Sequence, residues 1–366
     1  MTAYIDDLQE RVRAASAHRT ALRITGGGTK DFHPHGAPQS AGEPLALRPL
    51  AGVVSYEPTE LVVTARAGTP LAELQALLAA QDQCLAFEPP LFAPGGTVGG
   101  MVASGLSGPA RASVGALRDF VLGVEIVNGK GELLRFGGQV MKNVAGYDVS
   151  RLMAGSWGQL GVITEVSLKV LPRPVAEATL RFACTQEEAL ARLNAWGGRP
   201  LPLNASCWVQ ADGQALLYLR LRGARAAVDA AVRTLGGERV NDAAGDWDAC
   251  RDQRLPWFCA RAPEHALWRL SVPQTAPVLA LPEGVDAPLV EWHGGLRWVQ
   301  APLATGDALR VAARAVGGHA TLFRAPDAGG TSAGADFYPE NPALRAIHER
   351  LKQAFDPAGI FNTGRA

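Results

Sequence analysis

The apolar positions of the first 90 residues change period repeatedly, which predicts short helices and strands in alternation. Ile5, Leu8 and Val12 recur at helical spacing and predict an amphipathic helix. Thr69 followed by Pro70 is typical of a helix start, with threonine as the N-cap and proline in the first turn. The other elements predicted here are strands at 21–24, 53–56 and 61–67 and a helix that ends near residue 81. Such alternation is an α/β pattern.

The middle of the chain has strand-like patterns, and its later part alternates again. The elements predicted are a β-hairpin of strands 120–127 and 132–136, a short helix at 149–154, strands at 161–171 and 216–221, and helices at 225–235 and 342–355. Pro172 and Pro174 end the strand that precedes them. We therefore place a domain boundary at 173/174 and treat 326–366 as a separate C-terminal segment.

Composition and charge exclude several classes of function. The 366 residues suggest roughly two domains. With 35 basic and 35 acidic side chains, the chain lacks the excess positive charge typical of nucleic-acid binding. No apolar run is long enough for a transmembrane helix, and no signal peptide is visible. The five cysteines are scattered, so we expect neither a disulfide framework nor a metal site, and a cytoplasmic location.

Glycine is the unusual component, at 41 residues, and it is clustered. The G-x-G-x-x-G pattern of dinucleotide-binding folds is absent, and the one Gly-Lys pair, at 129–130, precedes glycine rather than Ser or Thr. A G-x-S-x-G pattern at 330–334 lies in a segment rich in Gly and Ala, whereas a nucleophilic serine of this kind needs a strand before it and a helix after it. These motif classes are therefore not favoured.

Two glycine clusters, at 26–28 and 95–100, each follow an extended apolar segment. Glycine lets backbone N–H groups approach a ligand closely, and consecutive N–H groups can form an anion-binding nest. Thr29 and Thr97 add hydroxyl donors. Two such loops suit a pyrophosphate that carries a nucleoside at each end. The alternative is that both are only tight turns.

Four segments, in order along the chain, resemble the FAD-binding domain of the vanillyl-alcohol-oxidase (p-cresol-methylhydroxylase) type. Residues 23–30 and 94–100 are similar to its two phosphate loops. Residues 155–166 are similar to the strand that passes the adenine, and residues 351–365 are similar to its C-terminal motif. The resemblance implies an α+β fold: a two-subdomain FAD-binding domain at 1–173, an α/β cap domain at 174–325, and a segment at 326–366 that returns to the FAD domain.

The resemblance also implies which residues bind FAD. They are Gly26, Gly27, Gly28, Thr29, Lys30, Pro94, Gly95, Gly96, Thr97, Gly99, Gly100, Arg111, Gly161, Val162 and Ile163. For Arg111 an exposed salt bridge is an equal alternative. The family's flavin-tethering histidine has no counterpart at its position in 29–32, so we expect non-covalent FAD. His33-Pro34-His35 is interpreted as a solvated loop.

Within this family, residues 107–111 and 142–148 look most like the FAD-binding subunits of bacterial glycolate oxidase (glycolate dehydrogenase), and the short chain fits the smaller of them. This implies oxidation of a small 2-hydroxy acid, glycolate, to glyoxylate, with a homologous FAD subunit and an iron–sulfur subunit as partners. It also implies a cytoplasmic location, peripheral at the inner membrane through the complex. The alternatives are a self-sufficient FAD oxidoreductase for another hydroxy acid or alcohol, and a scaffold without cofactor.

No catalytic residue can be assigned. Oxidation of a 2-hydroxy acid needs a cation for the carboxylate, a base for the hydroxyl proton and a flavin. The residues considered are His265, His293 and His319 in the cap, for each of which a structural role is favoured over a catalytic one, and Lys142 and Tyr147, which suit either the flavin or an interface. Residues 291–293 are interpreted as a buried strand. Seven of the eight tryptophans lie in the cap, which suits either its core or a partner surface.

Overall fold

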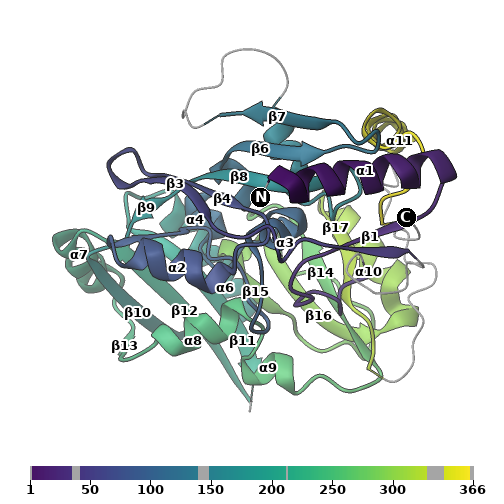
Figure 1. Cartoon of the computed structure of the whole chain (residues 1–366). Helices are drawn as coiled ribbons and strands as arrows, with labels where there is room; N and C mark the ends of the chain where they lie inside the picture. Colours follow the sequence, from purple (N-terminus) through teal and green to yellow (C-terminus); the bar gives the residue numbers. More distant parts are fainter. Residues whose placement is uncertain (1, 35–41, 139–147, 212, 328–341, 363–366) are drawn as a thin grey trace. The chain divides into compact units, whose positions relative to one another are not determined.

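The computed structural model describes residues 2–34, 42–138, 148–211, 213–327 and 342–362 (Figure 1). The chain divides into two units. The first comprises Met1–Leu106, Ala116–Pro172 and Asp336–Ala366, and the second comprises Ser107–Gly115 and Arg173–Ala335. The change of unit after Pro172 lies next to the predicted boundary, whereas the assignment of 107–115 to the second unit has no counterpart in the sequence-based division. The predicted motifs at 142–147 and 330–334 lie outside the described residues.

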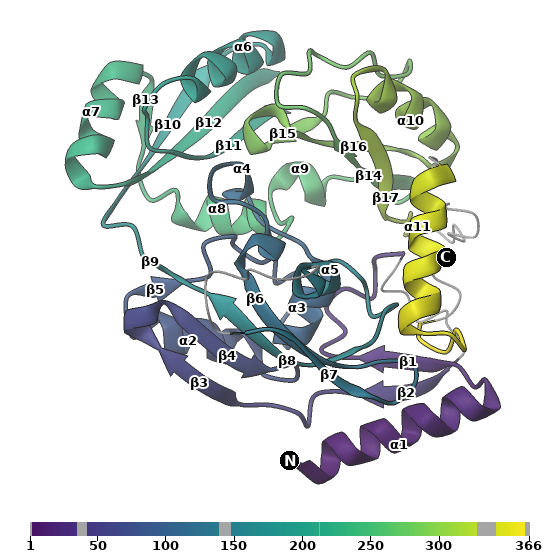
Figure 2. The same cartoon turned by 90° about the horizontal axis from the view of Figure 1, so that it is seen from above.

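The first unit is built on a five-stranded antiparallel sheet with the order β3-β4-β8-β6-β7 (Figure 2). Its strands are β3 (Val53–Glu57), β4 (Val62–Arg66), β8 (Val162–Lys169), β6 (Val121–Val127) and β7 (Leu133–Gly137). Helix α3 (Val98–Ser104) contacts β4 and β8, and helix α5 (Val149–Met153) contacts β6 and β7. The predicted hairpin and the strands on either side of Pro58 are confirmed.

Smaller elements complete this unit. They are α1 (Thr2–His18), β1 (Leu22–Thr25) parallel to β2 (Glu43–Ala46), α2 (Leu71–Ala79), β5 (Gln83–Cys84) paired with β9 (Leu171–Pro172), the 3-10 turns η1 (Pro58–Glu60) and η2 (Leu117–Phe120), and α11 (Pro342–Phe355). Helix α1 buries Leu8 and Val12, as its periodicity predicts. The predicted bounds of the final helix are also confirmed.

The predicted N-cap of α2 is wrong. Helix α2 begins at Leu71, and Pro70 precedes it without a side-chain cap. The buried hydroxyl of Thr69 instead donates to the carbonyl of Gly52 at 3.1 Å and accepts from its N–H at 3.0 Å. The hydroxyl of Thr69, which the local pattern assigns to the N-terminus of the helix, is therefore used in a tertiary contact with Gly52. Thr97, by contrast, is a true N-cap, because its Oγ1 accepts from Gly100 N at the start of α3.

The second unit is built on an eight-stranded sheet with the order β13-β10-β12-β11-β15-β16-β14-β17. The strands are β10 (Ala176–Ala183), β11 (Leu203–Ala211), β12 (Gln214–Gly223), β13 (Glu238–Val240), β14 (His265–Ser271), β15 (Leu289–Glu291), β16 (Leu296–Pro302) and β17 (His319–Arg324). The helices and turns are α4 (Arg111–Val114), α6 (Gln186–Gly197), α7 (Arg225–Leu235), α8 (Ala244–Arg251), α9 (Pro256–Cys259), η3 (Trp292–Gly294), η4 (Leu303–Thr305) and α10 (Gly306–Ala315).

One face of this sheet carries the apolar core. Helices α6 and α7 pack on β10 and β12 there, and α10 packs on β14, β16 and β17. On the other face α8 brings Cys250 to Glu291, and α9 brings Phe258 to Trp298. The predicted strand at 216–221 and helix at 225–235 are confirmed. Alternation along the strands therefore divides an apolar face from a face that holds polar groups.

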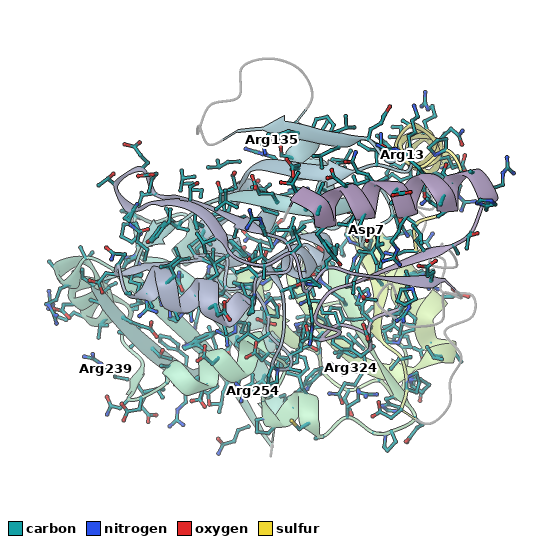
Figure 3. All side chains as sticks on the ribbon, in the orientation of Figure 1. Asp7, Arg13, Arg135, Arg239, Arg254 and Arg324 are labelled. Atoms are coloured by element: carbon teal, nitrogen blue, oxygen red, sulfur yellow. The ribbon has the colours of Figure 1, made fainter. Side chains whose placement is uncertain are left out.

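Charged side chains lie mainly on the surface of each unit, as Arg135, Arg239 and Arg254 do in Figure 3. Arg135 is on β7, where it binds the carboxylate of Glu125 at 2.7 Å. No helix in the described ranges has the length and apolar character needed to cross a bilayer.

The chain segment after α11 is anchored in the first unit by one buried carboxylate. Asp356 accepts hydrogen bonds from the N–H groups of Ile360 at 3.0 Å and Phe361 at 2.9 Å, and it pairs with Lys352 at 2.5 Å. These contacts hold residues 360–362 beside β1, where Leu22 N donates to Ile360 O. The C-terminal motif thereby reaches the strand that precedes the first glycine loop.

Asp356→Ala should lower the free energy of unfolding by about 3 kcal/mol, because two buried N–H groups and a lysine lose a charged partner. The measurement is urea denaturation monitored by fluorescence and circular dichroism. Glu238→Gln is the control, since it removes only the exposed pair with Arg181 and should leave the free energy of unfolding almost unchanged. Equal losses in the two variants would contradict the anchoring role.

Candidate functional site

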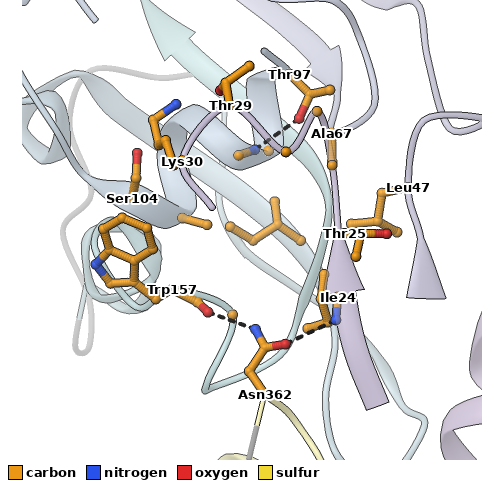
Figure 4. Close-up of a pocket in the computed structure, with 18 of the residues that line it drawn as sticks. Ile24, Thr25, Thr29, Lys30, Leu47, Ala67, Thr97, Ser104, Trp157 and Asn362 are labelled. Atoms are coloured by element: carbon orange, nitrogen blue, oxygen red, sulfur yellow. Dashed lines mark hydrogen bonds between the residues drawn. The ribbon is translucent and has the colours of Figure 1, made fainter. Parts of the chain in front are cut away.

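The first unit contains a cavity of about 260 Å³ at the end of β1 (Figure 4). Its wall comes from distant parts of the sequence: Arg23–Asp31, Leu47, Ala67, Thr97, Gly99, Gly100, Ala103, Ser104, Trp157, Gly158, Gly161, Ile163 and Asn362. The two predicted glycine loops thus share one cavity with the third and fourth motifs, although these segments are far apart in the chain.

The two loops meet backbone to backbone, and this contact requires glycine. A Cβ on Gly27 would lie 1.9 Å from the carbonyl oxygen of Gly95. A Cβ on Gly26 would lie 2.7 Å from Oγ1 of Thr97. Real Cβ atoms do not approach other atoms this closely, so any side chain at Gly27 would push the loops apart.

The close contact leaves a row of backbone donors. Among the described residues, the N–H groups of Gly26, Gly27, Gly28 and Thr29 form no hydrogen bond. In the second loop the N–H groups further along are used within the protein: Gly99 donates to Ala67 O at 2.7 Å. Backbone donors without protein partners at a concave wall suit an anion, because several N–H groups share its charge. The donor set therefore fits a pyrophosphate.

Asn362 joins three segments of the cavity wall. Its Oδ1 accepts from Ile24 N at 3.0 Å, and its Nδ2 donates to Trp157 O at 2.8 Å (Figure 4). Sequence reasoning missed this role, as it did for Trp157 and Ser104. Asn362 and Trp157 both lie within the motifs at 351–365 and 155–166. The motifs therefore predicted that these segments are important, but not the hydrogen bond between them.

The structure places most predicted cofactor residues in this wall. Those lining the cavity are Gly26, Gly27, Gly28, Thr29, Lys30, Thr97, Gly99, Gly100, Gly161 and Ile163. Four predicted residues are not among those that line the cavity: Pro94, Gly95, Gly96 and Val162. The carbonyl group of Gly95 nevertheless contacts Gly27 of the first loop. Arg111 belongs to the second unit, where its guanidinium lies over the ring of Trp292.

The interpretation of His33 as a solvated side chain is wrong. Its exposed fraction is 8%, and its ring stacks on Trp157 with a centroid separation of 4.3 Å. The indole that buries it is 124 positions away in the sequence, so no local pattern shows the contact. His35 lies outside the described residues.

A second group of polar side chains surrounds the turn η3 in the second unit. The predicted strand ends at Glu291, and Trp292 and His293 both adopt left-handed backbone angles, with φ of 54° and 55°. His293 N donates to Ser206 Oγ at 2.9 Å, and His293 Nε2 lies 3.0 Å from Ser113 Oγ. Burial lowers the pKa of His293 to about 4. The ring is therefore neutral near pH 7.

The other predicted catalytic candidates do not join His293. His265 begins β14, and His319 begins β17, where burial and the charge of Arg269 lower its pKa. In the described part of the chain, no cluster of three or more His, Cys, Asp or Glu side chains has the arrangement of a metal site. Lys142 and Tyr147 lie outside the described residues.

Comparison with known proteins gives matches in sequence. A family described as FAD binding domain matches residues 3–137. Glycolate oxidase subunit GlcE of Escherichia coli (strain K12) is 45% identical over 362 residues, which are 99% of this chain and 97% of that protein. Glycolate oxidase subunit GlcD of Bacillus subtilis (strain 168) is 30% identical over 176 residues, which are 48% of this chain and 37% of that protein.

Solved structures give the same fold at low sequence identity. A 4-ethylphenol oxidase from Gulosibacter chungangensis superposes with a TM-score of 0.69 at 16% identity, over 99% of this chain and 87% of that one. An alkyldihydroxyacetonephosphate synthase superposes with a TM-score of 0.62, also at 16% identity, over 98% of this chain and 74% of that one. The expected α+β fold of the vanillyl-alcohol-oxidase type is confirmed.

Gly27→Ala should weaken FAD binding by about tenfold or more, because the added Cβ forces the loops apart at a cost of roughly 1–3 kcal/mol. The measurement is titration of the FAD-free protein with FAD, followed by flavin fluorescence. Gly245→Ala in α8 is the control, since its Cβ meets nothing within 4 Å. Unchanged affinity in Gly27→Ala would contradict the role of the loop contact.

His293 should make stability depend on pH. Its pKa of about 4 in the folded protein lies below the ordinary value of 6.5, so the unfolded chain binds its proton first. The contribution of the neutral His293 ring to the free energy of unfolding is complete above pH 6.5. It falls by about 3 kcal/mol as the pH is lowered to 4.

His293→Asn should flatten the pH dependence of the unfolding free energy in this window, because asparagine tolerates left-handed angles but does not titrate. The measurement is urea denaturation at several pH values. His348→Asn, at an exposed position of α11, should keep the wild-type slope. The same slope in wild type and His293→Asn would refute the assignment.

Proposed function

The chain belongs to the family of the glycolate oxidase subunit GlcE, and on that premise we propose that it is the FAD-binding subunit of a complex that oxidises glycolate to glyoxylate. It is an FAD-dependent oxidoreductase that acts on CH–OH groups. The observation that carries the proposal is the cavity of the first unit, where two glycine loops meet and the first of them presents backbone donors that have no acceptor among the described residues.

We assign the FAD pyrophosphate to the two loops. The N–H groups of Gly26, Gly27 and Gly28 would donate to its oxygens, so the protein needs little positive charge to hold it. Residues 161–163 would contact the adenine side through the backbone, as the family resemblance implies. When bound, FAD supplies a two-electron acceptor for oxidation of the CH–OH group.

We further propose that FAD is held non-covalently. No histidine, cysteine or tyrosine is found among the described residues that line the cavity. The nearby His33 is engaged with the indole of Trp157, which fits a structural role.

The electrons would leave the chain through an iron–sulfur subunit. An iron–sulfur cluster generally needs four ligands of the cysteine type. The chain has five cysteines, which lie in different segments, and no three of them form a metal-binding group in the described part of the chain. A homologous FAD subunit is the other expected partner, and we place the complex in the cytoplasm with peripheral association at the inner membrane.

The test is a comparison of the purified chain alone and with both partner subunits. Alone, it should have a flavin absorption spectrum, and acid precipitation should release all of the FAD. Anaerobic addition of glycolate should reduce an artificial electron acceptor rapidly only in the assembled complex. Rapid turnover by the isolated chain would instead favour a self-sufficient oxidoreductase, and absence of flavin binding would refute the assignment of the cavity.

A further inference from the structure

We propose that Cys207 and Cys250, in the second unit, are a dithiol that a small disulfide oxidises reversibly to an intramolecular disulfide bond. The proposal depends on neither the cofactor nor the substrate assigned above. It concerns two thiols and a cavity that the cofactor motifs do not include.

Two strands and a helix of the second unit bring the thiols together. Cys207 lies on β11, directly opposite Glu291 of the neighbouring strand β15, so the two side chains point to the same face of the sheet. Cys250 lies on α8, and its Sγ donates to Glu291 Oε1 at 3.3 Å. The thiols of Cys207 and Cys250 are also hydrogen-bonded to each other. Residues that are far apart in the sequence thus place two sulfur atoms in contact.

Both thiols line a cavity of about 340 Å³, which is bounded by strands β10, β11 and β12 and by helices α8 and α9. A cavity of this size can hold a small molecule. The exposed fractions of Cys207 and Cys250 are only 4% and 3%, so the cavity is the path by which a reagent reaches them. Two other residues of its wall, Asp246 and Pro256, are exposed, which marks the side on which the cavity opens to solvent.

The remaining cysteines differ from this pair. All five cysteines lie in the described ranges and are reduced, and only Cys207 and Cys250 share the cavity. Cys184 belongs to the apolar core on the opposite face of the sheet, and Cys259 is exposed at the end of α9. In the cytoplasm, where we place this chain, disulfides of mesophilic proteins are mostly transient and serve catalysis or redox sensing. A pair that is reduced at rest fits such a role.

The surroundings of Cys250 suit the second step of the oxidation. In the first step Cys207 attacks one sulfur of the small disulfide, and its proton goes to the thiolate that is released. The hydrogen bond with Cys207, burial and the charge of Glu291 raise the pKa of the Cys250 thiol, so Cys250 stays protonated meanwhile.

In the second step Cys250 attacks the sulfur of Cys207 and releases the other small thiolate. Glu291, which already accepts the S–H hydrogen bond, takes the proton and passes it to this thiolate. The two cysteines together lose two electrons and two protons, and the small disulfide becomes two thiols. Because Cys250 is already in contact with Cys207, this step is intramolecular and precedes attack by a second molecule of reagent.

The disulfide bond would join α8 covalently to β11. Trp247 lies on α8 and lines the same cavity, and its Nε1 donates to Thr179 Oγ1 on β10 at 2.9 Å. Its fluorescence should therefore change when α8 is fixed to the sheet. The temperature of thermal unfolding should rise, because a covalent link restricts the unfolded chain.

The experiment treats the purified full-length chain with 2-hydroxyethyl disulfide, alkylates the remaining thiols in acid-quenched samples, and maps the peptides by mass spectrometry. The wild type should give a peptide pair joined through Cys207 and Cys250, and dithiothreitol should restore both thiols. Cys250→Ser should stop at a mixed disulfide between Cys207 and one half of the reagent. Glu291→Gln should close the bond more slowly, because an amide does not take the proton of Cys250.

Cys184→Ala is the matched control. Cys184 is also buried, but its Sγ donates to Phe182 O in the apolar core, away from the cavity. This variant should form the bond between Cys207 and Cys250 as the wild type does. Circular dichroism and thermal unfolding of every variant show whether it is folded, so that a loss of the fold is recognised separately.

The exposed Cys259 shows within each sample that the reagent is active. If Cys259 of the folded wild type forms a mixed disulfide while Cys207 and Cys250 stay alkylatable, the inference is overturned. It is also overturned if the two cysteines join only in urea, or if Cys207 of the wild type accumulates as a mixed disulfide. None of these measurements uses FAD or glycolate, so their failure leaves the proposed function untouched.

Discussion

The contact between the backbones of Gly27 and Gly95 determines the geometry of the cofactor cavity. With 1.9 Å between a hypothetical Cβ and the carbonyl oxygen, only glycine permits the two loops to meet. Among the described residues, the N–H groups of 26–29 have no hydrogen-bond acceptor. Backbone donors that the described protein leaves open at a concave wall suit a bound anion, because several N–H groups share its charge.

The remainder of the first unit keeps this contact in place. Asp356 holds the segment that follows α11, and that segment delivers Asn362 to the backbone of Ile24 and Trp157. The strand before the first loop is thereby fixed from both sides, by β2 and by residues 360–362. The described part of the C-terminal motif, residues 351–362, consequently reaches the cofactor cavity through the hydrogen bonds of Asn362 to the backbone of its wall.

The sequence predicted the features that depend on local periodicity or on a backbone requirement. Helices α7 and α11 and the hairpin β6–β7 follow from apolar spacing, and the glycine loops follow from their composition. Thr69 and His33 were misassigned because tertiary partners, Gly52 and Trp157, decide their environments. For the same reason the position of Arg111 over the ring of Trp292 could not be predicted, since α4 and η3 lie far apart in the chain.

The glycine cavity binds an anion with neutral backbone dipoles. Residues 26–29 are partly exposed in the structure, so water can solvate their N–H groups when no ligand is present. A bound pyrophosphate would replace this water and spread its charge over several N–H groups at once. The cavity therefore needs little positive charge to hold the cofactor and costs little without it, which suits an anion that stays bound.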